Sequence, residues 1–451
     1  MPKIAFVGAG SLGFTRTLVR DILSWEDLAG STLSLIDVDP VRLDYARRVV
    51  ERIVKVGNYP AKVEATLNRP QGLKGADIVL TTILAHGADG FRPEIDIPMK
   101  YGVDFNVGDS YGTAAVFRAL RTIPMMLDIA RDMERYAPNA YLLNYTNPMT
   151  MLCRAIQRET AVRAVGLCHS VQGLGAMLGA WIGAPREEIV CVCAGINHQA
   201  WAIRFEWKGK DAYPLLRRAI LRDKKIYQQE IVRNELFLAL GAYVTESSGH
   251  NSEYCWWFRK RPDLVEKYCT HGTGWNPGVH RMVLNEYENR EANARWQKDM
   301  EDWAEGRVEI KLGRSHEYAS SIIRGLLFGE EFTFNGSVPN TGAIGNLPYG
   351  CCVEVPVIAD KAGFRPIISG DLPIPCAALN QLHTNIVELT VEAAVKGDYT
   401  AAYQACCLDP VAASVLSLAE IKQMVDELFR VQAPLLPQFK LKGNRKTKKA
   451  V

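Results

Sequence analysis

Two short stretches of the chain bring together side chains that can do chemistry. One apolar run ends directly in Cys168, His169 and Ser170, which are a thiol, an imidazole and a hydroxyl. A second strand-like run ends in Asn197 and His198. Because thiolates and imidazoles both bind divalent transition metals, Cys168 and His198 could hold one ion between two strand ends. The alternative is a buried cysteine and a hydrogen-bonded histidine, since two ligands are a weak sign of a metal site.

The start of the chain predicts a dinucleotide-binding turn. A short strand runs into Gly8-Ala9-Gly10-Ser11-Leu12-Gly13, the pattern G-x-G-x-x-G, and a helical stretch follows. We expect Gly8 to allow the tight turn, Gly10 to let the backbone approach a pyrophosphate, and Gly13 to let the helix pack closely on the strand. The N-terminus of that helix would meet the phosphate charge. A glycine-rich turn kept for packing alone is the alternative.

An acidic residue follows at the spacing that this turn requires. The next strand ends in Asp37, where a carboxylate accepts hydrogen bonds from the adenosine ribose and repels a 2′-phosphate. The sequence therefore predicts NAD rather than NADP as the cofactor. The expected cofactor-binding residues are Gly8, Gly10, Ser11, Gly13 and Asp37.

The elements that position these residues alternate between strands and helices. Buried strands are predicted at 76–83, 140–148 and 162–168, with helices between them, one of which should be kinked or split at Pro124. This alternation predicts a parallel sheet, in which ligands bind beyond the carboxyl ends of the strands. Asn147 and Cys168 should therefore lie where the nicotinamide would be.

The second half of the chain loses the regular alternation. Residues 301–330 read as mainly helical, residues 351–369 as two strands around a turn, and a long amphipathic helix should stop at Gly397. The predicted fold class is α/β, an N-terminal Rossmann-type doubly wound parallel sheet with a C-terminal α+β domain. The expected domains are an NAD-binding domain at 1–196, a substrate-binding and oligomerisation domain at 197–439, and a basic, disordered tail at 440–451.

Composition excludes several other classes of protein. Eleven cysteines are scattered without zinc-type spacing, and the N-terminus does not resemble a signal peptide, which together indicate reduced thiols in the cytoplasm. The longest apolar runs are too short to span a membrane. The tail carries six basic residues and no acid, so the rest of the chain is net negative. We therefore expect neither nucleic acid nor a membrane as a partner.

Ten stretches of the chain together resemble one enzyme family. They run from "GAGS", "LIDVDPVRL", "RALRTIP" and "NYTNPM" through "VGLCHSVQG" and "AGINHQAW" to "VTESSGHNSEY", "EYASSII", "NLPYGCCVEVP" and "AALNQLHTNI". In this order they resemble glycoside hydrolase family 4, over almost the whole chain. The "CHSV" and "TESSGHNSEY" stretches are similar to its α-galactosidase branch. The resemblance implies NAD and a divalent metal, usually Mn²⁺, held by Cys168 and His198, and a homodimer or homotetramer.

The family also implies a mechanism and further site residues. A terminal α-galactoside would be oxidised transiently at C3, deprotonated at C2, and cleaved by elimination and water addition. The resemblance assigns the base to Tyr254, the general acid to His169 and a site carboxylate to Asp109, after which this chain reads "YGTAA" where the family reads "GPGG". Substrate contacts are expected at Asn147, His250 and Arg314. Three of these residues could instead have purely structural roles. These are packing in an aromatic core for Tyr254, helix capping for Asn147, and a surface ion pair for Arg314.

Several functions remain open from the sequence. Within the family, an α-glucosidase or an α-glucuronidase or galacturonidase differs from an α-galactosidase by one hydroxyl orientation or one carboxylate. Outside it, the chain could be an NAD-dependent sugar or hydroxy-acid dehydrogenase, or a catalytically silent NAD-binding regulator.

Overall fold

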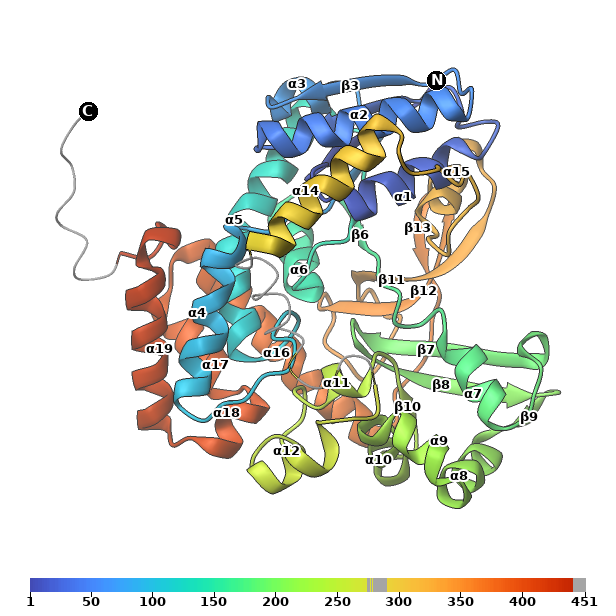
Figure 1. Cartoon of the computed structure of the whole chain (residues 1–451). Coiled ribbons are helices and arrows are strands. Elements are labelled where there is room, and N and C mark those ends of the chain that lie inside the picture. Colours follow the sequence, from blue (N-terminus) through green and yellow to red (C-terminus); the bar gives the residue numbers. More distant parts are fainter. Residues whose placement is uncertain (274–275, 277, 279–289, 441–451) are drawn as a thin grey trace.

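The N-terminal part of the chain forms a parallel sheet connected by helices (Figure 1). The structure is a computed structural model that describes residues 1–273, 276, 278 and 290–440. Six strands pair in parallel in the order β6-β5-β4-β1-β2-β3, the order of a doubly wound dinucleotide-binding sheet. The predicted Rossmann-type fold is therefore confirmed. Its elements are β1 (Lys3–Val7), α1 (Leu12–Leu23), β2 (Thr32–Ile36), α2 (Pro40–Val56), β3 (Lys62–Thr66), α3 (Arg69–Leu73), β4 (Ile78–Thr81), α4 (Gly87–Lys100), α5 (Gly112–Tyr136), β5 (Tyr141–Asn144), α6 (Met149–Glu159) and β6 (Arg163–Gly166).

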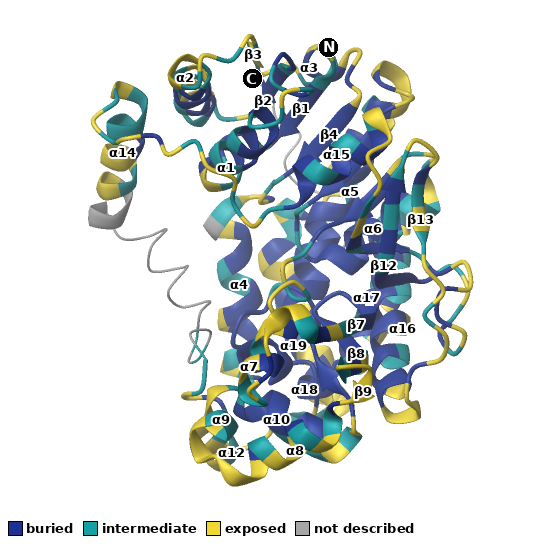
Figure 2. Ribbon diagram, turned by 90° about the vertical axis from the view of Figure 1, so that its right-hand side faces the viewer, coloured by how far each residue is buried: buried dark blue, intermediate teal, exposed yellow. Residues whose placement is uncertain are grey.

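The central strands are apolar along their length because parallel strands are covered on both faces. Strands β4 and β5 are buried at every position, and β4 is dark blue in Figure 2. The helix expected to be kinked or split at Pro124 is α5, which runs as one helix through this residue, so the split is wrong and the kink stays a prediction. An interior proline costs about 3 kcal/mol. Most of α5 is buried, and that burial offsets the cost.

Beyond β6 the same sheet continues with antiparallel strands. Strand β11 pairs with β6 and β12, and the order then runs through β7, β8 and β10. The boundary expected at residue 196 falls at the turn between β7 and β8, within this continuous sheet. The two strands predicted within 351–369 form β12 and β13. The elements of this region are α7 (Leu174–Trp181), β7 (Ile189–Ile196), β8 (Gln199–Trp207), β9 (Lys210–Asp211), α8 (Tyr213–Arg222), α9 (Lys224–Gln229), α10 (Ile231–Leu240), β10 (Tyr243–Val244), α11 (Ser248–Asn251), α12 (Pro262–Tyr268), β11 (Phe332–Pro339), β12 (Cys352–Asp360) and β13 (Gly363–Pro366).

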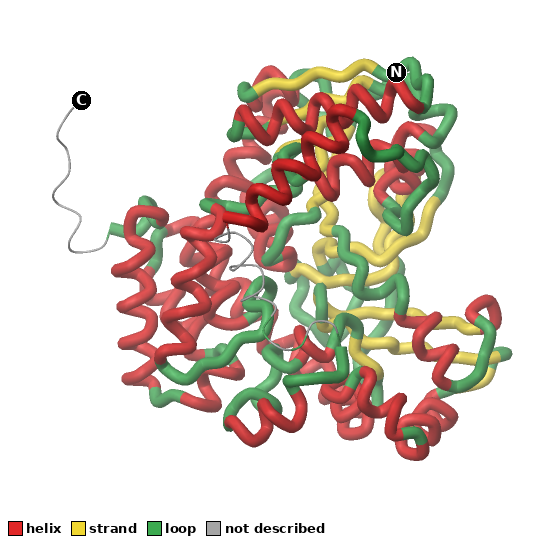
Figure 3. Tube along the Cα trace, viewed as in Figure 1, coloured by secondary structure: helices red, strands yellow, loops and turns green. Residues whose placement is uncertain are grey.

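Helices dominate one side of the molecule, where α4 and α5 lie beside the C-terminal helices (Figure 3). Helix α16 ends at Lys396 because Gly397 adopts a left-handed conformation with φ +66°, as predicted. The C-terminal helices are α16 (Ile374–Lys396), α17 (Tyr399–Cys407), α18 (Pro410–Val415) and α19 (Leu418–Gln432).

The helical prediction for 301–330 is wrong in its middle. Helix α14 (Arg290–Glu305) stops before Gly306, whose φ is +84°, and α15 (Ala319–Phe328) begins later. The irregular stretch between them bonds to α1 through side chains rather than continuing a helix.

Two further predictions concern membrane-spanning segments and the basic C-terminal tail. Within the described part of the chain, no helix is both long and apolar enough to cross a membrane. The basic tail, apart from Lys440, lies outside the described residues, so its predicted disorder stays a prediction.

Candidate active site

A cavity of about 660 Å³ lies beyond the carboxyl ends of β5 and β6. Its wall combines residues of α1, the strand-end loops and the segment around α11. Both the Rossmann-type helix α1 and the predicted metal-binding residues therefore face one space. The described residues that line it are Phe14, Asp109, Tyr145, Asn147, Met149, Leu167, Cys168, His169, Ser170, Gly173, Leu174, Met177, His198, Glu230, Arg233, Glu246, Ser247, His250 and Thr273.

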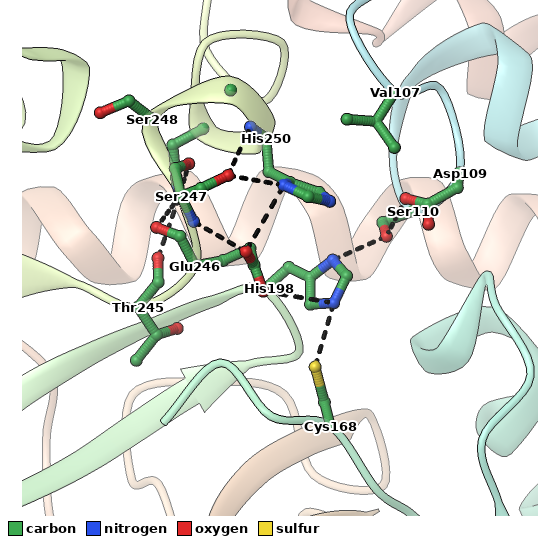
Figure 4. Close-up of polar contacts among 12 residues, drawn as sticks. Val107, Asp109, Ser110, Cys168, His198, Thr245, Glu246, Ser247, Ser248 and His250 are labelled. Atoms are coloured by element: carbon green, nitrogen blue, oxygen red, sulfur yellow. Dashed lines mark hydrogen bonds and ion pairs between the residues drawn. The ribbon is translucent and has the colours of Figure 1, made fainter. Parts of the chain in front are cut away.

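Cys168, His198 and Glu246 form a cluster that could hold a metal ion (Figure 4). The Cys168 Sγ lies 3.1 Å from Nε2 of His198, and the same nitrogen lies 3.8 Å from a Glu246 carboxylate oxygen. One sulfur, one nitrogen and one oxygen atom all lie within 4.8 Å of one another. That separation lets a single divalent cation contact all three atoms.

The backbone at two of these residues is unusual. His198 has φ +63° at the turn between β7 and β8, and Glu246 has φ +54° before α11. Left-handed backbone is uncommon for residues other than glycine, and such strain concentrates at functional sites. Both side chains are turned toward the cluster by these conformations (Figure 4).

The other ring nitrogen of His198 is held by neighbouring hydroxyls. Its Nδ1 lies 2.8 Å from Ser110 Oγ and 3.3 Å from the phenol oxygen of Tyr254. Burial lowers the pKa of His198, but Cys168, Glu246 and Asp109 together raise it well above the ordinary value. These acidic neighbours make the centre of the cavity attractive to a cation. Ser110 and Tyr254 orient the ring so that Nε2 faces Cys168 and Glu246.

A second possible ligand group shares His198. It consists of Asp109, His198 and His250, whose ligand atoms also lie within 4.8 Å of one another. Burial would raise the pKa of Asp109, but the charges of His250, His198 and Arg118 lower it. The Asp109 carboxylate is thus ionised in the cavity wall, where it accepts a hydrogen bond from Asn147 Nδ2 at 3.0 Å.

Asn147 lines the cavity and also carries an acceptor atom without a partner among the described residues. Its Oδ1 atom is buried and has no hydrogen-bond partner within the described chain. Buried polar atoms are nearly always satisfied, so this orphan is consistent with a ligand hydroxyl as the missing partner. The alternative of helix capping is wrong, because α6 has no side-chain cap.

His169 is partly exposed at the mouth of the same cavity. Its Nε2 lies 2.5 Å from Oε1 of Glu317. This hydrogen bond to Glu317 is the main cause of a raised pKa of His169, although burial opposes it. The predicted role of His169 as a general acid requires that its imidazole stay protonated. The Glu317 carboxylate favours the protonated form.

Tyr254 is more deeply buried than a catalytic base should be, whereas His250 lines the cavity. The Tyr254 side chain is fully buried and packs edge-to-face on Tyr111, and it is not on the described wall of the cavity. Burial raises the pKa of Tyr254 well above its ordinary value, which is the opposite of what a base requires. His250 does line the cavity, with Nδ1 2.8 Å from Ser247 Oγ and 3.5 Å from a Glu246 oxygen.

The glycine turn joins β1 to α1 as predicted. Gly8 has φ +88°, and a Cβ at this residue would lie 2.5 Å from a backbone oxygen, so only glycine fits. Asp37 accepts a hydrogen bond from the Gly10 N–H at 2.7 Å and thereby fixes the turn. A Cβ at Gly10 would collide with Asp37 and Arg42. The start of α1, at Ser11, has no side-chain cap, which leaves this helix end open to an anion.

Gly13 and Arg314 lie in surroundings that differ from those expected. A Cβ at Gly13 would meet no described heavy atom within 4 Å, so close helix–strand packing is not the reason for this glycine. Arg314 is not part of the cavity. Its Nε donates to Ser24 Oγ at 2.8 Å, and its guanidinium lies 3.3 Å from the Trp25 ring centroid at the end of α1. The guanidinium therefore contacts an aromatic ring and a hydroxyl of the Rossmann-type half, and its predicted contact with a sugar stays a prediction.

Sequence reasoning missed Glu246, Glu317 and Tyr318. All three stand in stretches that resemble the family, "VTESSGHNSEY" and "EYASSII". Their contacts with His198, His169 and Cys168 cross between distant segments, so spacing along the chain gives no sign of them.

The fold and site together define a Rossmann-type enzyme with an added candidate metal cluster. Residues 3–183 match the profile described as Family 4 glycosyl hydrolase, and residues 193–412 match the Family 4 glycosyl hydrolase C-terminal domain. The chain therefore belongs to glycosyl hydrolase family 4, as the sequence resemblance predicted.

Individual members of the family are similar to this chain over almost its whole length. An alpha-galactosidase of Bacillus subtilis (strain 168) is 37% identical over 452 residues, covering 98% of this chain and 100% of the relative. An alpha-galactosidase of Rhizobium meliloti (strain 1021) is 33% identical over 449 residues, covering 97% and 89%. A 6-phospho-alpha-glucosidase from gut microorganisms, crystallised with NAD and Mn²⁺, shares the fold with a TM-score of 0.77 at 18% identity, covering 97% and 100%.

Proposed function

We propose that this chain is an NAD- and divalent-cation-dependent α-galactosidase. The observation that carries the proposal is that one cavity contains both Phe14, in the first turn of α1, and the Cys168–His198–Glu246 cluster. Similarity to two α-galactosidases supports the substrate class. The homodimer or homotetramer predicted from the family stays a prediction.

The residues present fit both groups. For NAD, the uncapped start of α1 and the open space beside Gly13 leave room for a pyrophosphate, and Asp37 stands beside the turn to meet a ribose. For the cation, the donors are one sulfur, one nitrogen and one carboxylate oxygen. Sulfur and nitrogen favour softer metals than Mn²⁺, whereas the carboxylate and sugar oxygens suit Mn²⁺, which also accompanies NAD in the gut-microorganism enzyme. When bound, NAD would accept and return a hydride at C3, and the cation would stabilise negative charge on the oxygens at C2 and C3.

The protein's own residues would then position the sugar and move protons. The free Oδ1 of Asn147 accepts a hydrogen bond from a sugar hydroxyl, and Asp109 fixes that amide through its Nδ2. His169 gives its proton to the departing aglycone oxygen. Its position at the cavity mouth, beside Glu317, suits contact with a leaving group that extends toward solvent.

Tyr254 remains the proposed base for the C2 proton. Its phenol oxygen lies 3.3 Å from the His198 ring, and catalytic contacts often tighten only when substrate is bound. A nearby cation would oppose the effect of burial and lower its pKa. Replacing Tyr254 with Phe should therefore lower kcat much more than it changes KM.

The proposal is tested with a panel of α- and β-linked nitrophenyl glycosides, including galactosides, glucosides and galacturonides. The purified chain is incubated with NAD⁺, Mn²⁺ and a thiol reductant. We expect α-galactoside hydrolysis that needs both additions and leaves no net NADH. Full activity after complete removal of NAD would contradict the proposal, and accumulation of NADH with an oxidised sugar would instead indicate a dehydrogenase.

A further inference from the structure

Cys168 and His169 are contacted by two neighbouring residues of a distant segment, Tyr318 and Glu317. The phenol oxygen of Tyr318 accepts the backbone N–H of Cys168 at 3.1 Å, and its O–H donates to the carbonyl of the same residue. A hydroxyl can donate and accept at once, so one side chain satisfies both backbone groups of Cys168. Tyr318 is itself buried and packs against Phe334. The peptide that carries the candidate metal ligand is therefore fixed from outside its own strand.

The preceding residue, Glu317, contacts the side chain of His169. Oε1 of Glu317 lies 2.5 Å from His169 Nε2, and Oε2 accepts the hydroxyl of Tyr145 at 3.2 Å. Only 12% of the Glu317 side chain is exposed, against 49% of the His169 side chain. A largely buried carboxylate with two partners thus limits the rotation of a more exposed imidazole.

The segment that carries this pair is anchored to α1. The Ser315 N–H donates to Asp21 Oδ1 at 2.8 Å, and its hydroxyl donates to the other oxygen of the same buried carboxylate. Ser315 Oγ in turn accepts the N–H of Glu317 at 3.0 Å. Arg314 adds its hydrogen bond to Ser24 at the end of α1. Contacts therefore run without a break from the last turn of α1 to Cys168 and His169.

We propose that Tyr318 and Glu317 are positioning residues, Tyr318 for the Cys168 sulfur and Glu317 for the His169 imidazole. The inference rests on the proposed function, in which Cys168 holds the cation and His169 protonates the leaving group. Outer groups that orient a metal ligand commonly affect metal affinity or activity 10–100-fold, about the size of effect expected here.

Tyr318→Phe tests the first half of the proposal. The matched control is Tyr213→Phe, because the Tyr213 hydroxyl also accepts a backbone N–H, from Tyr243, and donates to a carbonyl, that of Ala202. Mn²⁺ binding to the NAD-saturated full chain is measured from the electron paramagnetic resonance signal of free Mn²⁺. We expect Tyr318→Phe to raise the Mn²⁺ Kd about tenfold. The Kd of the control should not change, and equal affinities in both variants would overturn this half.

Glu317→Gln tests the second half. Its control is Glu427→Gln, since Glu427 likewise accepts a tyrosine hydroxyl, from Tyr101, and pairs with a cation, Lys100. The readout is kcat/KM for methyl α-galactoside relative to 4-nitrophenyl α-galactoside. A misplaced acid harms the poor methoxide leaving group most, so this ratio should fall about tenfold in Glu317→Gln and stay constant in the control. An unchanged ratio would overturn this half, because general loss of structure lowers both rates equally.

The outcomes separate this inference from the proposed function. If wild-type chain neither binds Mn²⁺ nor cleaves α-galactosides, the proposed function fails and the positioning roles fail with it. If wild-type chain does both and the variants match their controls, the positioning roles fail alone. Thermal unfolding without Mn²⁺ should be equal within each pair of variant and control, and a variant that unfolds early is replaced by Tyr318→Trp or Glu317→Asp.

Discussion

The glycine turn and the Cys168–His198–Glu246 cluster draw on the sequence in different ways. The turn comes from one contiguous stretch, Gly8–Gly13, whose geometry is set by local backbone preferences and by Asp37 of the next strand. The cluster joins three segments separated by 30 residues or more, and two of its members have left-handed backbone. Local rules therefore suffice for the turn, whereas the cluster depends on the whole sheet being assembled.

The largest effect should come from the cluster. Cys168→Ser removes the sulfur donor and should lower kcat/KM at least about 10³-fold, because a catalytic cation supplies several kcal/mol of charge stabilisation. Cys407→Ser, at a half-buried thiol outside the cavity, is the control and should keep wild-type activity. Steady-state kinetics with NAD⁺ and Mn²⁺ measures both. Wild-type kinetics in Cys168→Ser would mean that the cluster is not the catalytic centre.

A smaller effect, a loss of Mn²⁺ affinity, tests Glu246, the member of the cluster that the sequence did not predict. Glu246→Gln keeps the shape of the side chain but removes its charge, so Mn²⁺ affinity should fall about 10- to 100-fold. Titrating activity with Mn²⁺ gives the apparent affinity. The control is Glu235→Gln, whose carboxylate accepts the Tyr227 hydroxyl away from the cavity. If both variants need the same Mn²⁺ concentration, Glu246 is not a ligand.

The turn allows a sharper contrast between two glycines. An added Cβ at Gly10 would lie 2.7 Å from Arg42 Cβ, so Gly10→Ala should destabilise the fold by about 1–3 kcal/mol. At Gly13 an added Cβ meets only open space, so Gly13→Ala should leave the free energy of unfolding unchanged or raise it by about 0.5–1 kcal/mol. NAD binding should nevertheless weaken in Gly13→Ala if the pyrophosphate occupies that space. Chemical denaturation and calorimetric titration with NAD⁺ distinguish these effects, and unaltered NAD affinity would place the pyrophosphate elsewhere.

Stability should also depend on pH through His383, which lies in α16. Burial lowers the pKa of His383 to about 4, and its Nε2 lies 2.9 Å from the Tyr254 carbonyl. The unfolded chain binds this proton more readily than the folded chain does. The contribution of His383 is therefore complete above about pH 6.5 and is lost as the pH falls toward 4. Denaturant unfolding at several pH values in this range gives the free energy of unfolding of wild type and of His383→Gln. This free energy should change less steeply with pH in the variant. The same pH dependence in both proteins would show that His383 does not titrate this way.

Much of the fold could be predicted because its signals are local. Alternating strands and helices gave the parallel sheet, and the left-handed Gly397 ended α16 where expected. The continuous α5 could not be foreseen, because burial outweighed the local effect of Pro124. The irregular stretch before α15 was also missed, because its residues bond to Asp21 and Ser24 at the end of α1 instead of forming helical hydrogen bonds.

Spacing predicted the site only where strand ends bring residues together, whereas Asp109 and His250, which also line the cavity, were predicted from the family resemblance. Cys168 and His198 each follow a strand of one sheet, and the structure brings their side chains into contact. Glu246 and Tyr318 reach these residues from segments far along the chain, which no spacing rule indicates. Arg314 was expected as a substrate contact from the family resemblance, whereas the structure places it over Trp25, outside the described wall of the cavity.

The central claim is that Cys168, His198 and Glu246 hold one divalent cation in the cavity that α1 also lines. Co²⁺ is the most direct probe, since a cobalt–thiolate bond gives a near-ultraviolet charge-transfer band. Titrating the NAD-saturated chain should produce this band with one equivalent of Co²⁺, in wild type and Cys407→Ser but not in Cys168→Ser. A band that persists without Cys168, or a wild-type chain that never shows one, would contradict the claim.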